Sequence, residues 1–138
     1  MDELLKAIVA RYNGATGNAL RVLTVGGLWL TQAPQKAAGV YIVMTPMPSN
    51  EDTAKSTDTA KPFTQDCYIQ FTFSTLLGTA LDILAAMKEF DVVYKFCTFT
   101  MTGYSLLVSK RLKHNGPMRD DLTRGQTAYV DYRFTIGG

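Results

Sequence analysis

The residue types best suited to catalysis or metal binding are few in this chain and lie far apart. There is one histidine, His114, and there are two cysteines, Cys67 and Cys97, thirty residues apart. A structural zinc site needs about four nitrogen or sulfur ligands at short spacings, and no Gly-x-Ser-x-Gly elbow accompanies the histidine. We expect His114 to lie in a solvated loop, and the cysteines to pack as small buried side chains in strands without a disulfide. The sequence therefore predicts no catalytic site, no metal and no cofactor.

Glycines and paired carboxylates give no stronger sign of an active site. The stretch Gly14-Ala15-Thr16-Gly17 lacks the Lys-Ser/Thr ending of a phosphate-binding loop, so we interpret it as a turn. The adjacent acids Glu51-Asp52 and Asp120-Asp121 each lie in a hydrophilic stretch, and neighbours on a loop need not converge on one substrate. We interpret both pairs as solvated charges.

Two polar segments are the most informative parts of the chain. Residues 48–62, PSNEDTAKSTDTAKP, form a stretch longer than the usual connection of about 4–6 residues, and long loops in small domains often carry function. Residues 110–124, KRLKHNGPMRDDLTR, hold five basic side chains against two acids. For this second segment two readings stay open: a solubilising loop, or a contact surface for something acidic, either a neighbouring subunit or DNA.

Length and composition limit the class of protein. The chain has 138 residues, 46% of them hydrophobic, and a formal net charge of +2. These values predict one folded domain over residues 1–138, and they exclude a disordered chain and a strongly cationic DNA-coating protein. No apolar stretch approaches the roughly 18–20 residues needed to cross a bilayer. The acidic start MDELLKAIVARY favours an amphipathic helix over a secretion signal, so we expect an intracellular, soluble protein with no membrane partner.

Periodicity and turn residues then place the elements that would position any site. The expected elements are a helix at 3–12, strands at 28–30, 40–45 and 66–73, a helix at 75–90, and strands at 92–101, 104–111 and 128–136. Residues 20–23 could form either a short strand or a helical turn, and residues 112–125 are expected to be a polar loop. The order α-β-β-β-α-β-β-β predicts an α+β domain, a mostly antiparallel sheet with two helices packed on one face.

Two of these elements have a definite facing. Alternation in 66–73 places Cys67, Ile69, Phe71 and Phe73 on the buried face of a strand. In the second helix we expect Ser74 to be the N-cap, a buried stripe at Leu77, Leu81, Leu84 and Met87, and an end at Phe90-Asp91.

The overall pattern resembles the tail-completion, or tail terminator, proteins of tailed bacteriophages. The residues that carry the resemblance follow in chain order: Gln32-Ala33-Pro34, the apolar strand Gly39 to Met44, the strand Cys67 to Phe73, the helix Thr79 to Phe90, and the closing strand Tyr129-Val130-Asp131-Tyr132-Arg133-Phe134. The resemblance covers nearly the whole chain in order and spacing.

The resemblance implies a structural virion protein rather than an enzyme. Terminators of this kind form a hexameric ring at the head-proximal end of the tail tube, stop tube polymerisation and join the tail to the head connector. The implied partners are further copies of the chain, the tail tube protein, a head-completion protein and, without sequence specificity, the genomic DNA that passes through the ring. The implied location is the tail or neck of the virion, after assembly in the host cytoplasm.

A closed ring needs two different complementary patches on each subunit, and the two polar segments are candidates for them. The candidate subunit or neck contacts are Asn50, Glu51, Asp52, Lys55, Asp58 and Lys61 in the first segment, and Arg119, Asp120, Asp121 and Arg124 in the second. Lys110, Arg111 and Lys113 are the candidates for contact with DNA in the lumen or with a partner protein.

Three alternatives stay open at this point. The first is a head-completion or stopper ring at the same neck, and the second is an unrelated interaction module that pairs through a sheet edge. The third is a small-molecule-binding domain with a pocket between helix and sheet. Stoichiometry and tube binding separate the ring proteins from the others, whereas ligand-dependent stabilisation would favour the third.

Overall fold

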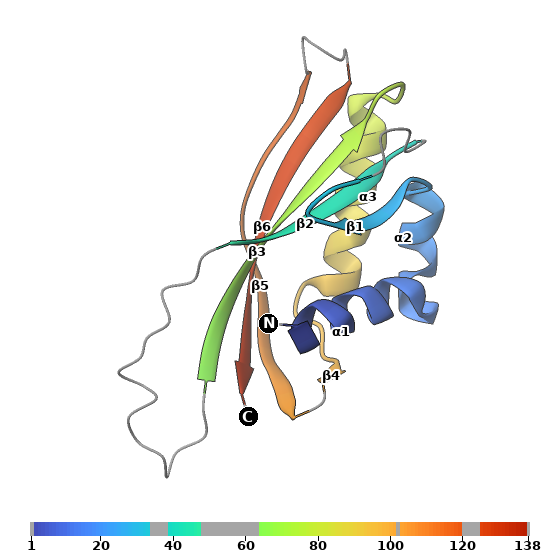
Figure 1. Ribbon diagram of the computed structural model, residues 1–138. Coiled ribbons are helices and arrows are strands. Elements are labelled where there is room, and N and C mark those ends of the chain that lie inside the picture. The colour runs from blue at the N-terminus through green and yellow to red at the C-terminus, as the bar shows by residue number, and fades with distance from the viewer. Residues whose placement is uncertain (1, 34–38, 48–63, 102, 120–124, 138) are drawn as a thin grey trace.

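The computed structural model describes residues 2–33, 39–47, 64–101, 103–119 and 125–137. The elements are α1 (Asp2–Asn13), a 3-10 turn η1 (Ala15–Gly17), α2 (Asn18–Leu23), β1 (Gly27–Leu30), β2 (Tyr41–Met47), β3 (Thr64–Thr75), α3 (Ala80–Tyr94), β4 (Thr100–Met101), β5 (Tyr104–Arg119) and β6 (Gln126–Gly137). All the helices lie on one face of a single sheet (Figure 1), which confirms the expected α+β class.

Within the described residues the sheet has six strands, in the order β1-β2-β3-β6-β5-β4. Among these described strands, the pair β1–β2 is parallel and the other pairs are antiparallel. The strand latest in sequence, β6, lies between β3 and β5, and pairs with β3 along its full length, from Thr64 opposite Gly137 to Thr75 opposite Gln126. The centre of the sheet thus joins segments that are far apart in sequence.

Alternation along β3 and β6 builds the core. The expected facing is confirmed, since Cys67, Ile69, Phe71 and Phe73 are all fully buried. On β6 the residues facing the helices are also buried: Ala128, Val130, Tyr132, Phe134 and Ile136. Aromatic rings dominate where these strands meet α3, and the ring centroids of Phe71 and Phe90 are 4.5 Å apart. The alternate side chains of both strands point to the face that the helices leave bare.

The N-terminal helix was predicted correctly, and the ambiguous residues 20–23 belong to the helix α2. Arg21 closes the end of α1, since its guanidinium donates to the carbonyl oxygens of Tyr12 at 2.5 Å and Gly14 at 2.6 Å. The chain passes so close at Gly17 that a Cβ there would lie 2.2 Å from the Tyr12 carbonyl oxygen. Only glycine fits this approach between α1 and α2.

The predicted limits of α3 were wrong at both ends. Ser74 lies in β3, and the helix begins after Thr79, whose side chain forms a reciprocal capping box with Asp82. The helix continues to Tyr94, so the predicted strand 92–101 is reduced to β4, and Cys97 lies in the segment between α3 and β4. The β-branched Val92 and Val93 favour a strand locally, but burial of Val93 and Tyr94 against the sheet prevails.

The predicted buried stripe of this helix was also wrong. Leu77, Leu81 and Leu84 are 99%, 75% and 45% exposed, and only Met87 of the four is buried. The residues of α3 that face the sheet are Ile83, Ala86, Met87, Phe90, Val93 and Tyr94. The helix has apolar residues on its core side and on its solvent side, so hydrophobic periodicity alone does not identify the buried side.

The expected loop at 112–125 was wrong for most of its length. β5 continues to Arg119, with irregularities in its pairing to β6 between Leu106 and Val108, between Arg111 and Lys113, and between Asn115 and Met118. His114 therefore lies on a strand and is exposed. Polar side chains at an exposed strand conceal the alternation that would identify it, and bulges interrupt the two-residue period.

Candidate interaction surfaces

Most residues predicted to contact a neighbouring subunit or the neck lie outside the described part of the chain: Asn50, Glu51, Asp52, Lys55, Asp58, Lys61, Asp120, Asp121 and Arg124. Arg119 is described, and it is exposed at the end of β5 opposite Gln126.

The three basic residues predicted to meet DNA or a partner do not form one patch. Lys110 and Lys113 are exposed and lie opposite Arg133 and Asp131 of β6. Arg111 lies opposite Tyr132 and points to the helical side, where its guanidinium bonds the Asp91 carboxylate at 2.6 Å. Arg111 is thus held by a contact within its own subunit, whereas Lys110 and Lys113 face outward.

Asp91 links α3 to the sheet through two partners. It accepts hydrogen bonds from Arg111 and from the Tyr132 hydroxyl. Burial is the main reason why the pKa of Tyr132 is raised well above its ordinary value, and the hydrogen bond to the Asp91 carboxylate raises it further. Each polar group of this network has a partner, as is usual in a folded interior.

A second polar cluster holds the segment that follows α3. The Ser109 hydroxyl donates to the Tyr94 carbonyl oxygen at 2.5 Å and accepts from the Cys97 amide at 3.0 Å. Burial raises the pKa of the Cys97 thiol, so the thiol stays protonated at neutral pH and is a poor nucleophile. Neither Cys67 nor Cys97 forms a disulfide. The cluster fixes backbone geometry and offers no catalytic group.

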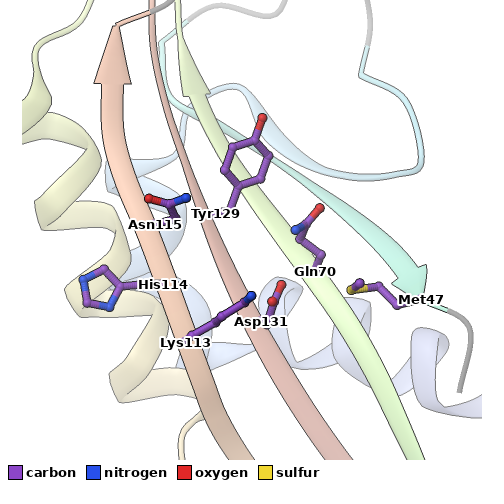
Figure 2. Close-up of a pocket in the computed structure, with 7 residues that line it drawn as sticks. All are labelled: Met47, Gln70, Lys113, His114, Asn115, Tyr129 and Asp131. Atoms are coloured by element: carbon purple, nitrogen blue, oxygen red, sulfur yellow. The ribbon is translucent and has the colours of Figure 1, made fainter.

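The bare face of the sheet carries a polar pocket of about 230 Å³. Its lining comes from four strands: Met47 of β2, Gln70 of β3, Lys113, His114 and Asn115 of β5, and Tyr129 and Asp131 of β6. Figure 2 shows His114 directed away from the other six side chains, and Lys113 directed toward Asp131. This pocket was not predicted, because its residues come from strands distant in sequence, although the alternation along 128–136 had already placed Tyr129 and Asp131 on one face.

Two charged residues near the centre of this bare face have unused hydrogen-bonding atoms. Asp131 Oδ1 and Arg133 Nε are buried and have no hydrogen-bond partner among the described residues. Asp66 on the same face differs, because its Oδ1 accepts from the Thr135 hydroxyl at 2.6 Å. A buried polar atom without a partner destabilises a fold by about 1–3 kcal/mol, so each orphaned atom in a native protein requires an explanation.

On the opposite side of the molecule, α3 presents an exposed apolar surface. The outer stripe of α3, defined as Leu81, Leu84, Ala85, Lys88 and Val92, faces away from the sheet, and all five residues are exposed. Beside it runs a groove of about 440 Å³, lined in part by Val22, Val25 and Leu77. A helix with apolar residues on its solvent side as well as on its core side departs from the usual amphipathic pattern, and contiguous exposed apolar surface marks an interaction site.

A further hollow of about 400 Å³ lies between α1 and the sheet, lined by Leu5, Lys6, Val9, Ala10, Leu28, Leu30 and Met44. The ammonium of Lys6 is paired with Glu3 at 3.1 Å. Ligand sites combine apolar walls with a few polar groups that orient the ligand, and this lining offers none that is free. The hollow therefore gives no support to a small-molecule site.

The described residues contain no group of three or more His, Cys, Asp or Glu side chains that could hold a metal ion. In that same part of the chain, no helix is long and apolar enough to span a membrane. The features that stand out are surfaces suited to protein contacts: the polar pocket on the bare sheet face and the outer stripe of α3.

Comparison with known proteins gives a structural match. No protein-family model matches the sequence, and no curated protein matches it. Among solved structures, a chain described as "Virion of native gene transfer agent (GTA) particle" is similar to this one, with a TM-score of 0.75 and 16% sequence identity. The match covers 99% of this chain and 96% of the other. At this level of identity the similarity establishes a shared fold over the whole chain.

Proposed function

We propose that this chain is a structural subunit of a phage-like virion that forms a hexameric ring at the head-proximal end of a tail tube. There it stops tube polymerisation and joins the tail to the head connector. The observation that carries the proposal is the fold shared with a chain of the gene transfer agent virion over nearly the full length of both chains. The resemblance of the sequence to tail terminators points to the same role.

The surfaces of the subunit suit this role. A ring is closed by heterologous contacts, in which two different patches of each subunit meet. The chain offers an exposed apolar helix stripe on one side and a polar sheet face on the other. A ring component acts through such contacts and needs no catalytic group.

The proposed partners are further copies of the chain, the tail tube protein and a head-completion protein, and the proposed location is the tail or neck. Lys110 and Lys113 are exposed cations. If they face the lumen, they would meet the phosphate backbone of passing DNA without reading its sequence.

Native mass spectrometry of the purified protein, alone and mixed with tail-tube ends, tests the proposal. A hexamer, or a monomer that becomes a hexamer only on tube ends, supports it. A stable dimer that ignores tubes overturns it. A hexamer that binds portal or connector complexes but not tubes would reassign the chain to a stopper role on the head side.

Arg119 and Arg124 test the predicted subunit or neck interface. The double variant Arg119→Glu, Arg124→Glu is expected to reduce ring or neck assembly by at least about tenfold while the subunit keeps its melting temperature, because reversing interface charges opposes association. Lys95→Glu is the control, since this exposed cation lies over its own neighbour Phe96. Unchanged particle assembly would remove both arginines from the interface.

A further inference from the structure

The outer stripe of α3 has one charge at its centre. Leu81, Leu84 and Ala85 precede Lys88 and Val92 follows it, and the helical repeat places all five on one side. Leu81 is 75% exposed and Val92 is 67% exposed, so no described part of the subunit covers this surface. The Lys88 ammonium has no ion-pair partner among the described residues. The stripe is therefore apolar surface with one unpaired cation near its centre.

The polar pocket on the bare sheet face has the complementary pattern. Its acidic residue is Asp131, whose carboxylate has no hydrogen-bond donor and no ion-pair partner in the described part of the chain. Met47 and Tyr129 border it with apolar and aromatic surface. Tyrosine and methionine are enriched at protein interfaces. The rest of the lining is polar, and Lys113 is directed toward Asp131 (Figure 2) without an ion pair between them in the described part of the chain.

We propose that the outer stripe of α3 docks on the bare sheet face of a second copy of this chain, with the Lys88 ammonium in the pocket beside the Asp131 carboxylate. The dimensions agree: the stripe from Leu81 to Val92 is about 17 Å long, and β6 from Tyr129 to Thr135 spans about 20 Å. Because the contact joins two different surfaces, each copy can bind the next in the same way. The inference rests on the proposed function only for the closure of these copies into a hexamer.

This contact removes two unfavourable features of the isolated subunit at once. It buries the exposed leucines of α3, and it gives the Asp131 carboxylate a donor. Burying a charge is favourable only when a partner of opposite charge is buried with it, and each surface supplies one member of the pair. Each sheet then has helices on both faces, its own and those of the next copy.

Carbodiimide coupling followed by peptide mass spectrometry tests the contact directly, because the reagent joins an amine and a carboxylate that are already paired. The expected product is an intermolecular link between Lys88 and Asp131. The intramolecular pair Lys6–Glu3, at 3.1 Å, is the positive control for coupling. A link between Lys113 and Asp131 in place of the expected one would mean that the pocket is neutralised within the subunit, and it would overturn the proposal.

Charge exchange provides the second test. Lys88→Asp and Asp131→Lys are each expected to weaken association of the subunits by at least about 30-fold, because each leaves one charge facing a like charge. The double variant is expected to recover most of the association. Asp66→Lys is the matched control on the same sheet face, where the wild-type carboxylate already binds Thr135. Single variants that assemble like the wild type would overturn the contact.

The two proposals can fail separately. A wild-type hexamer that is indifferent to both charge reversals keeps the ring and refutes this contact. If the protein forms open chains or dimers whose association responds to the exchange of charge between Lys88 and Asp131, the contact is supported and the hexamer is refuted. A protein that stays monomeric at high concentration and on tube ends refutes both.

Discussion

The two faces of the sheet differ in the hydrogen bonding of an aspartate on each, Asp91 and Asp131. On the face covered by helices, Asp91 lies between Arg111 and the Tyr132 hydroxyl, and its carboxylate accepts a bond from each. On the bare face, Asp131 lies one residue before Tyr132 in the same strand and accepts none among the described residues. The strand that supplies a complete network on one side therefore supplies an incomplete one on the other.

This difference separates the charged groups that stabilise the folded subunit from those that are available for contacts between subunits. Groups that act within the monomer have their partners in the monomer. A group that acts between copies must leave some of its hydrogen-bonding capacity unused until they meet. Stability measurements can separate the two kinds of group, because only the first contributes to the fold of the isolated chain.

The largest expected difference between the faces comes from a charge placed on adjacent residues of β3. Phe71→Asp puts a carboxylate among Phe90, Tyr94 and Tyr132, where Phe71 is fully buried, and we expect no cooperatively folded protein because an unpaired buried charge is very unfavourable. Thr72→Asp, on the bare face, is expected to fold with a loss of less than about 1 kcal/mol. Circular dichroism melts measure both, and equal damage would mean that the bare face is buried too.

Alkaline pH is expected to destabilise the protein through two tyrosines on the helix-covered face of the sheet. Burial is the main cause that raises the pKa of Tyr94 and of Tyr132 above the ordinary 10.0, so above pH 10 the unfolded chain loses protons that the folded chain retains. Stability is therefore fully present below pH 10 and falls as pH rises beyond it, by about 2–3 kcal/mol in all between pH 9 and pH 11. Urea unfolding at both pH values measures the fall. Tyr94→Phe and Tyr132→Phe should each reduce it, and an unchanged slope in both variants would contradict the assignment.

The Asp91 network gives the next largest effect. Asp91→Ala leaves Arg111 without its carboxylate, and we expect the free energy of unfolding to drop by about 2 kcal/mol, below the full value for a buried pair because both side chains are partly exposed. The double variant Asp91→Leu, Arg111→Met is expected to recover part of that loss, since it removes both charges together. A double variant less stable than Asp91→Ala would show that packing, and not the ion pair, is the main contribution.

The smallest effect gives the sharpest comparison, because it concerns two aspartates on one face. Asp66→Ala removes the acceptor of the Thr135 hydroxyl and is expected to destabilise the monomer by about 1 kcal/mol. Asp131→Ala removes a carboxylate that binds nothing in the monomer, and should leave the melting temperature unchanged or raise it. Differential scanning calorimetry under monomeric conditions decides the matter. A clear fall for Asp131→Ala would show that this carboxylate already has a partner within the fold.

The sequence predicts the fold better than the site, for a physical reason. Strict alternation in 66–73 and in 128–136 reports burial on one side of a sheet, and both strands were placed correctly. The helix α3 misled prediction because its outer leucines follow the same period as its core residues, and β5 did so because polar side chains and bulges hide its alternation. The candidate residues in 48–62 and 120–124 lie outside the described part of the chain, so their interface role stays a prediction. The pocket around Asp131 depends on a strand order that no local pattern contains.

The central position of β6 has a consequence for how the chain reaches its fold. Until residues 126–137 have been synthesised, β3 and β5 have no strand between them, and each presents an edge with free amide and carbonyl groups. Synthesis from Thr75 to Gly137 takes about 3–12 s at the usual 5–20 residues per second, and through that time the nascent chain can form only fragments of the sheet. Folding is thus expected to complete late, in one step that inserts a single strand. Ribosome-bound chains cut short before Gln126 should therefore be protease-sensitive and should depend on chaperones, which bind the exposed edges that β6 later covers.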